Sequence, residues 1–121
     1  MTRTALIPSD SLDSNAAAGQ HYGRAKWYLI FDYTGRNVDN IPGDKTTRCG
    51  GVLKQLKDNL PEAIIVNHIG FPAYQSARYK DVAVMQMAPF RTAATAAAGY
   101  FSGKLKPLGK EQIHGYPDFK D

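Results

Sequence analysis

The stretch AIIVNHIG at residues 63–70 decides the fold. Its first five residues, Ala63 to Asn67, form an apolar run of strand length, which is typical of a strand covered on both faces of a sheet. Pro72 follows, at a position that suits the first turn of a helix, and we expect this helix to run to about Lys80. Residues 63–80 therefore predict a central strand, a short loop and a helix.

Strand patterns lie on both sides of this stretch. Aromatic, β-branched and unbroken apolar runs are typical of strands, and an alternating run after a turn is typical of a hairpin with one face in water. The predicted strands are residues 4–8, 26–32, 37–41, 63–67 and 82–85. The turn at Thr34-Gly35 joins the second and third of these, which predicts an antiparallel edge of the sheet.

Two further helices alternate with these strands. Apolar residues recur at helical spacing over residues 52–60, and Pro61 stops the pattern. Thr92 is placed to cap a third helix, and Gly103 is placed to end it. This alternation predicts an α/β fold with a mixed sheet. If the crossovers are right-handed, the first strand and the strand of the central stretch lie side by side and parallel at the sheet centre.

Composition limits the function classes. The chain has 121 residues, 43% of them hydrophobic and 21% charged, which predicts one globular domain. We place this domain at residues 1–105, followed by a polar tail at 106–121. Because no run approaches the about 18 apolar residues that span a bilayer, and no signal-peptide pattern begins the chain, we expect a cytoplasmic protein without a membrane partner. The formal charge of +4 favours an anionic partner, but the basic residues are scattered. A small anion fits this pattern better than a nucleic acid.

Two loops are expected to meet at the carboxyl ends of the central strands, where ligands of such sheets bind. One carries GQHYGRA at residues 19–25, in which His21 can bind a soft metal and Arg24 can pair with an anion. The other is His68-Ile69-Gly70, beside the start of a helix whose free N–H groups attract anions. The sequence therefore predicts an anion site to which imidazoles add metal coordination.

Other interpretations of the same residues stay open. Arg24 can simply pair with a nearby carboxylate in a glycine-flanked turn, and His68 can be a satisfied residue at a strand end. Cys49 is the one cysteine, so it excludes an internal disulfide and a cysteine-only metal site. Its thiol can join the crevice, or form a hydrolase nucleophile with His21 or His68, although the sequence fixes no such contact. His114 lies in the polar tail, where a solvated histidine is the default.

Three stretches together carry a family resemblance. They are HYGRAKWYLI at 21–30, AIIVNHIG at 63–70 and the run from Thr92 to Leu105, and the similarity covers residues 3–105 in matching order. They resemble the dinitrogenase iron–molybdenum cofactor biosynthesis family, which includes NifX, the C-terminal part of NifB and the orange protein. The resemblance implies a ribonuclease H-like three-layer α/β fold without nuclease function, with a mixed five-stranded sheet, an antiparallel hairpin and three helices.

The resemblance also implies a function and a site. The implied function is binding, carriage or storage of an anionic metal–sulfur cluster, of the iron–molybdenum precursor or molybdenum–sulfide type and with or without copper, by a protein that is not an enzyme. Cofactor-biosynthesis or acceptor proteins are the implied partners. His21 would ligate the cluster and Arg24 would neutralise its charge. The expected cofactor-binding residues are His21, Gly23, Arg24, Ile69 and Gly70, and the expected metal ligands are His21, His68 and Cys49.

This chain departs from the family pattern at one of these positions. Relatives usually have Gly-Gly-Ile-Gly where this chain has Asn67-His68-Ile69-Gly70. The histidine either adds a ligand or narrows the pocket. The alternative function, of a different class, is a metal-free regulatory or interaction module that binds a small organic or phosphate anion in the same crevice.

Overall fold

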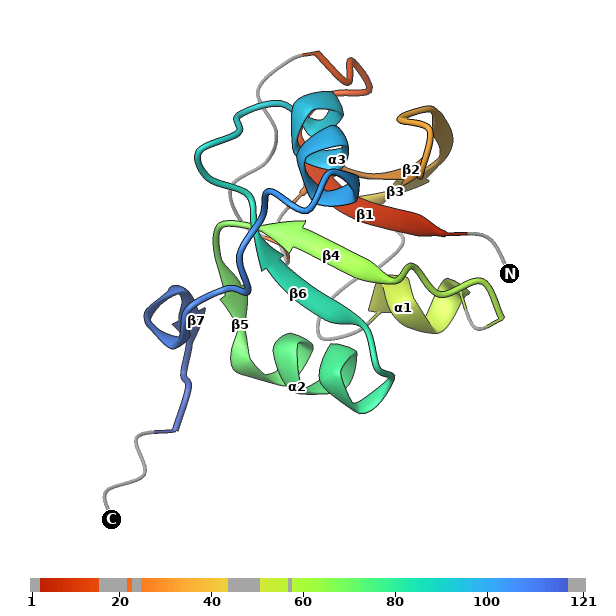
Figure 1. The fold of residues 1–121 in the computed structure, drawn as a ribbon. Coiled ribbons are helices and arrows are strands. Elements are labelled where there is room, and N and C mark those ends of the chain that lie inside the picture. Colours follow the sequence, from red (N-terminus) through yellow and green to blue (C-terminus); the bar gives the residue numbers. More distant parts are fainter. Residues whose placement is uncertain (1–2, 16–21, 23–24, 44–50, 57, 118–121) are drawn as a thin grey trace.

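The computed structural model describes residues 3–15, 22, 25–43, 51–56 and 58–117. Its main sheet has five strands in the order β3-β2-β1-β4-β6 (Figure 1). Strand β2 is antiparallel to β1 and β3, whereas β4 is parallel to β1 and β6. The strands are β1 (Thr4–Ser9), β2 (Trp27–Asp32), β3 (Asn37–Pro42), β4 (Ala63–Val66) and β6 (Ala83–Gln86). The predicted mixed five-stranded sheet with its antiparallel hairpin is confirmed, and β1 and β4 are neighbours at its centre.

Helices cover both faces of this sheet. They are α1 (Gly51–Leu56), α2 (Phe71–Tyr79) and α3 (Ala93–Phe101). Helix α3 lies on one face, and α1 and α2 lie on the other (Figure 1). Within the described residues the three predicted α-helices are therefore present, and the sheet is the middle of three layers.

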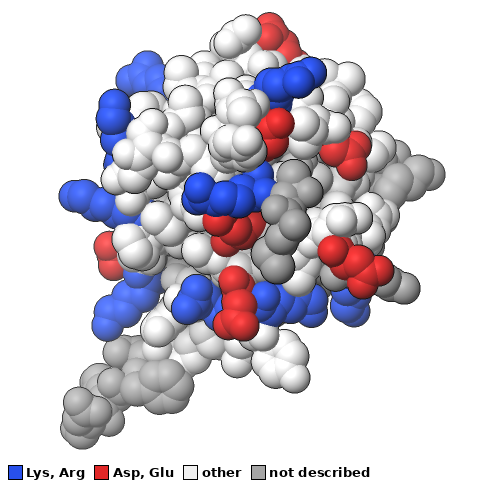
Figure 2. Space-filling model, turned by 45° about the vertical axis from the view of Figure 1, so that its right-hand side comes forward, with Lys and Arg blue, Asp and Glu red and all other residues white. Residues whose placement is uncertain are grey.

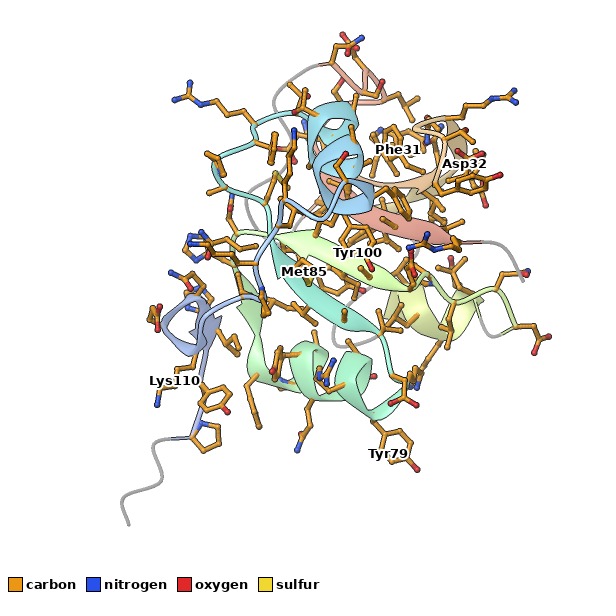
Figure 3. The ribbon with its side chains drawn as sticks, viewed as in Figure 1. Phe31, Asp32, Tyr79, Met85, Tyr100 and Lys110 are labelled. Atoms are coloured by element: carbon orange, nitrogen blue, oxygen red, sulfur yellow. The ribbon has the colours of Figure 1, made fainter. Side chains whose placement is uncertain are left out.

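The side chains of each central strand alternate between two cores. In β1, Leu6 faces the core under α1 and α2, whereas Ala5 and Ile7 face the core under α3. In β4, Ile64 and Ile65 divide in the same way, and all of these side chains are fully buried. Because both faces are covered, the strands are apolar without interruption, which is the pattern from which they were predicted. Figure 3 shows Phe31 of β2 beneath α3, in the second of these cores.

Helix α3 begins as the sequence predicts. The hydroxyl of Thr92 accepts a hydrogen bond from the N–H of Thr95 at 3.1 Å, and the Thr95 hydroxyl lies 3.4 Å from the Thr92 nitrogen, which completes a capping box. Beyond the other end, Gly103 has a φ of +74°, a conformation that glycine adopts without strain. The predicted cap and stop are therefore both confirmed.

Helix α1 is shorter than predicted. The apolar spacing predicts a helix over residues 52–60, but the helix ends at Leu56, and a turn follows at Asp58. Pro61 restricts Leu60 to extended backbone, so Leu60 cannot be helical. Leu60 still packs against the core, which explains why it fits the apolar pattern.

The sequence predicts a polar tail at 106–121, and the structure pairs part of this segment with the sheet. The Gln86 N–H donates to the Lys106 carbonyl at 2.7 Å, and the Leu108 N–H donates to the Val84 carbonyl at 3.0 Å, so this segment covers the outer edge of β6. A 3₁₀ helix, η3 (Lys110–Gln112), then leads into β7 (Ile113–His114). Strand β7 pairs in parallel with β5 (Ile69–Gly70) in a second, two-stranded sheet.

Candidate functional site

The candidate site lies beyond the carboxyl ends of β1 and β4. The Tyr22 N–H, from the predicted loop GQHYGRA, donates a hydrogen bond of 3.1 Å to the carbonyl of His68. The predicted meeting of the two loops is therefore confirmed at this contact. His21, Gly23, Arg24 and Cys49 lie outside the described residues, so their roles stay predictions.

Tyr22 supplies one side of the contact with His68, and its side chain is buried in the core. Its side chain is 3% exposed, and its ring stands edge-on to that of Tyr28 with centroids 5.4 Å apart. The Tyr28 hydroxyl donates to the Tyr22 carbonyl. The Tyr22 hydroxyl is buried without a partner among the described residues, and burial, followed by the nearby Tyr28 phenol, raises the pKa of Tyr22 well above its ordinary value. Tyr22 is therefore a neutral, buried residue at the contact with His68.

The segment 68–70 supplies the other side. His68 is half-buried, and its Nδ1 is buried with no hydrogen-bond partner among the described residues. Ile69 is fully buried in the core under α1 and α2, so it fixes the backbone of its neighbours. Gly70 is the N-cap of α2 and offers no side-chain cap, which leaves first-turn N–H groups open to an anion. Of the predicted site residues, His68 and Gly70 thus present polar groups. Ile69 instead holds this segment in place through its buried side chain.

The structure adds a residue that the sequence analysis assigned to solvent. His114 stands opposite Gly70 in the register of β5 and β7, and its ring centroid lies 5.7 Å from that of His68 with a tilt of 30°. The available signal was weak, because Leu108 and Ile113 are isolated apolar residues in a polar stretch. Both are buried in the same core as Ile69, and this burial brings His114 to the site.

Aromatic contacts hold the C-terminal segment against α2. The Tyr116 ring stands edge-on to Phe71 at 5.4 Å and to Tyr74 at 6.2 Å. Such pairs stabilise a contact by about 0.5–1.5 kcal/mol beyond the area that they bury. The position of β7 beside the crevice therefore rests on both core burial and aromatic packing.

The donor set for a metal is partial in the described part of the chain. No three His, Cys, Asp or Glu side chains gather there as a metal site. Imidazole nitrogen suits iron, copper, zinc and nickel, so an unpartnered His68 nitrogen fits a metal–sulfur cargo that brings its own sulfide ligands. A metal ion held by three or more His, Cys, Asp or Glu side chains would need His21 or Cys49, which lie outside the described residues.

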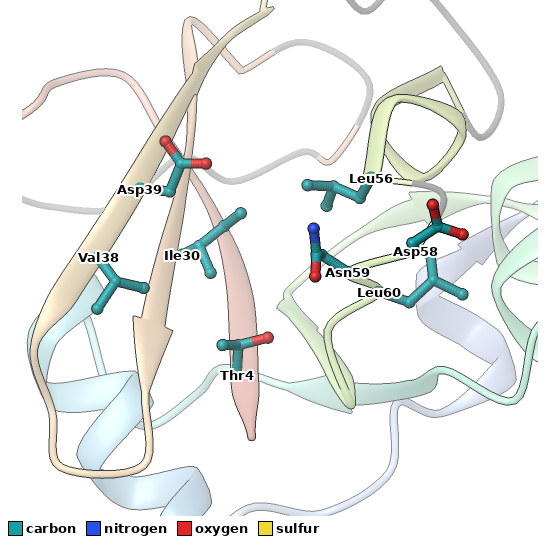
Figure 4. Close-up of a pocket in the computed structure, with 8 residues that line it drawn as sticks. All are labelled: Thr4, Ile30, Val38, Asp39, Leu56, Asp58, Asn59 and Leu60. Atoms are coloured by element: carbon teal, nitrogen blue, oxygen red, sulfur yellow. The ribbon is translucent and has the colours of Figure 1, made fainter. Parts of the chain in front are cut away.

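A pocket of about 510 Å³ lies at the opposite end of the sheet (Figure 4). Its lining includes Thr4, the first residue of β1, and Leu60, which precedes β4. Asp39 of β3 and Asp58 of the turn after α1 lie on its two sides (Figure 4). Two carboxylates disfavour an anionic guest. The complete lining is Thr4, Ile30, Val38, Asp39, Leu56, Asp58, Asn59 and Leu60.

The model of the dinitrogenase iron–molybdenum cofactor family matches residues 3–103 of this chain. The chain belongs to this family. The family description names iron and molybdenum and does not name copper, so copper has no support from it. A search of curated proteins found no match.

Solved structures share the fold. The apo form of the orange protein from Desulfovibrio gigas is similar with a TM-score of 0.74 and 14% identity, over 90% of this chain and 95% of that one. A NifB-like protein from Thermotoga, of the DUF35 family, has a TM-score of 0.71 and 22% identity, over 88% and 93%. A dinitrogenase-like protein from Methanocaldococcus jannaschii has a TM-score of 0.65 and 18% identity, over 90% and 97%. At these identities the likeness shows a common fold.

The described residues include no helix that is both long enough and apolar enough to cross a membrane. On the face shown in Figure 2, Lys and Arg side chains are interspersed with Asp and Glu rather than gathered in one basic patch. The described surface in this view therefore matches the scattered charges of the sequence.

Proposed function

We propose that this protein binds and carries an anionic iron- or molybdenum-containing sulfide cluster in the crevice between the loop at 19–25 and residues 68–70. The observation that carries the proposal is the hydrogen bond from Tyr22 to His68, because it holds the two segments together. His21 directly precedes Tyr22 in the chain, and Arg24 follows two residues later. Family membership associates the chain with the iron–molybdenum cofactor and supports this cargo.

The mechanism is binding. The uncapped N–H groups at the start of α2 and the guanidinium of Arg24 attract the negative charge, and the imidazoles of His21 and His68 coordinate metal. Cys49 is proposed as a further ligand. We also propose that the fold is ribonuclease H-like, which the sheet order β3-β2-β1-β4-β6 supports. Cofactor-biosynthesis or acceptor proteins would then receive the cargo in the cytoplasm.

The test is anaerobic titration of the purified protein with tetrathiomolybdate, followed by desalting, visible absorption and metal analysis. We expect coloured metal to be retained in fixed proportion to protein. Arg24→Ala is expected to weaken retention about tenfold or more, because a charge-assisted contact contributes about 1.5–3 kcal/mol. His21→Ala is expected to lose metal from the site.

Arg36→Ala is the matched control for Arg24→Ala. Arg36 is exposed in the hairpin turn between β2 and β3, at the other end of the sheet, so its loss changes net charge equally without touching the crevice. If both arginine variants reduce retention by the same factor, binding depends on overall charge and the crevice is not the site. If the protein stays colourless with tetrathiomolybdate and with an isolated iron–molybdenum precursor, cluster carriage is wrong.

A second candidate is the metal-free module for a small organic or phosphate anion. The uncapped start of α2 favours it, because a helix N-terminus binds anions without any metal. In that case Arg24→Ala abolishes anion binding, whereas His21→Ala has little effect.

A further inference from the structure

We propose that His68 and His114 bind a single transition-metal ion between their imidazoles, so that the C-terminal strand β7 supplies half of a metal site. This inference goes beyond the proposed function, because a mononuclear ion does not require the cluster. It shares only His68 with the cluster site.

The small sheet brings the two histidines to one face. Ile69 and Ile113 are direct partners in the register of β5 and β7, and both are buried in the core. Successive side chains of extended backbone point to opposite faces, so His68 and His114, each one residue from a buried isoleucine, face away from that core. The sheet thus places two imidazoles together on its outer face.

Gly70 leaves room between them. It is the register partner of His114 and carries no side chain. Among the described residues, the nearest atom that a Cβ at this position would meet is the Cδ of Pro72, at 3.9 Å, so no described side chain fills the space above Gly70. The rings of His68 and His114 can therefore approach each other across this residue.

The distance between the rings suits a shared metal ion. Their centroids are 5.7 Å apart. With metal–nitrogen bonds of about 2.0–2.1 Å, two imidazoles on one ion have centroids roughly 5–6 Å apart. The same separation also occurs in ordinary aromatic pairs, so distance alone does not decide the matter.

The hydrogen bonding of His68 favours a ligand role. The Nδ1 atom of His68 is buried and has no hydrogen-bond partner among the described residues. A buried polar nitrogen without a partner is unfavourable, because it has lost its hydrogen bonds to water and gained none in exchange. Imidazole is the commonest metal ligand in proteins, and coordination would satisfy a nitrogen that the described residues leave unsatisfied.

The donor set indicates the class of metal. Two neutral imidazoles without a third described ligand favour copper, zinc, nickel or cobalt over magnesium and calcium, which prefer oxygen. The Oε1 of Gln112 is also buried without a partner among the described residues, but the proposal gives this amide oxygen no role at the metal, because the metals that imidazole favours prefer nitrogen or sulfur to an amide oxygen. Water molecules would complete the coordination of the bound ion.

The test uses Zn²⁺ alone with the full-length, metal-free protein, in equilibrium dialysis and in NMR spectra of the imidazole groups. We expect one Zn²⁺ per chain and simultaneous shifts of the His68 and His114 signals. His114→Gln and His68→Gln are each expected to weaken binding at least tenfold. Gln112→Ala is the matched control from the same segment and should bind Zn²⁺ as the wild type does.

The chain has three histidines, so the remaining one identifies the competing site. If His21→Gln abolishes Zn²⁺ binding and His114→Gln does not, the inference is overturned. It is also overturned if the His68 and His114 signals do not move in the wild type, a measurement that needs no variant to fold. Because this assay contains no sulfide cluster, its failure is distinct from failure to retain tetrathiomolybdate.

Discussion

The two ends of the central sheet carry opposite chemistry. At the carboxyl ends of β1 and β4, His68 and His114 place two imidazoles beside the uncapped start of α2. At the amino ends, Asp39 and Asp58 line the pocket of about 510 Å³. Under the proposed function, an anionic guest would be attracted to the free N–H groups at the first end and repelled by the two carboxylates at the second. The difference teaches that the types of donor and charge, rather than the volume of a pocket, are the better guide to where the proposed cargo would bind.

The largest expected effect tests whether the carboxyl end depends on the C-terminal segment. Ile113→Ala removes a buried side chain that pairs with Ile69, and we expect it to lower the free energy of unfolding by about 2–4 kcal/mol. Zn²⁺ binding should fall with it, because His114 loses its support. Leu60 lines the pocket at the other end of the sheet and is only half-buried, so Leu60→Ala should lower the free energy of unfolding by less than half as much as Ile113→Ala. Urea unfolding measures both; an Ile113 variant as stable as the wild type would contradict the role given to β7.

A smaller effect separates the two tyrosines behind the crevice. Tyr28→Phe removes the hydroxyl that donates to the Tyr22 carbonyl, and we expect a loss of about 1–2 kcal/mol. Tyr22→Phe removes a buried hydroxyl without a described partner, so it should be neutral or stabilising. Thermal unfolding of the pair provides the comparison. A larger loss for Tyr22→Phe than for Tyr28→Phe would show that the Tyr22 hydroxyl has an important partner.

The burial of Tyr22 also predicts that the stability of the fold depends on pH. The pKa of Tyr22 is raised in the folded protein above its ordinary value of 10.0, so the folded state holds this proton more tightly than the unfolded chain. The associated stability is present below pH 10.0 and is lost as the pH rises above it. Tyr22→Phe should therefore lose less stability than the wild type in this alkaline range.

The smallest expected effect concerns the acidic pocket. Strand β1 has six residues and so separates the two ends by roughly 17–20 Å, about twice the screening length at physiological salt. The double variant Asp39→Asn with Asp58→Asn should therefore retain tetrathiomolybdate within about twofold of the wild type. Desalting followed by metal analysis measures it. If the double variant lost the retained metal, the pocket with Asp39 and Asp58, and not the end of the sheet with His68, would be the binding site.

Much of the fold was predictable because local patterns match the final environment. The apolar run at 63–66 is buried on both faces, and Thr92 forms the cap that its position predicts. Helix α1 was predicted too long because Leu60 packs in the core without being helical. Apolar spacing reports burial, and burial alone does not distinguish a helix from the turn that follows it.

Less of the site was predictable. Residues 68–70 were identified from their place after a buried strand, and the hydrogen bond between Tyr22 and His68 confirms that two distant segments meet. His114 was not identified, because its partner is 46 residues away by the numbering and its strand, β7, has only two residues. So short a strand leaves no periodic pattern to read.

The sequence by itself determined the five main strands, the order of helices, the cap of α3 and the membership of a cofactor family. These features depend on local spacing and composition, which the chain carries in linear form. Only the tertiary structure decided that the C-terminal segment returns to β5, that His114 faces His68, and that a pocket lined by Asp39 and Asp58 lies at the other end of the sheet. The physical reason is that such contacts join residues far apart in sequence, and the burial of Leu108 and Ile113 in a shared core determines them.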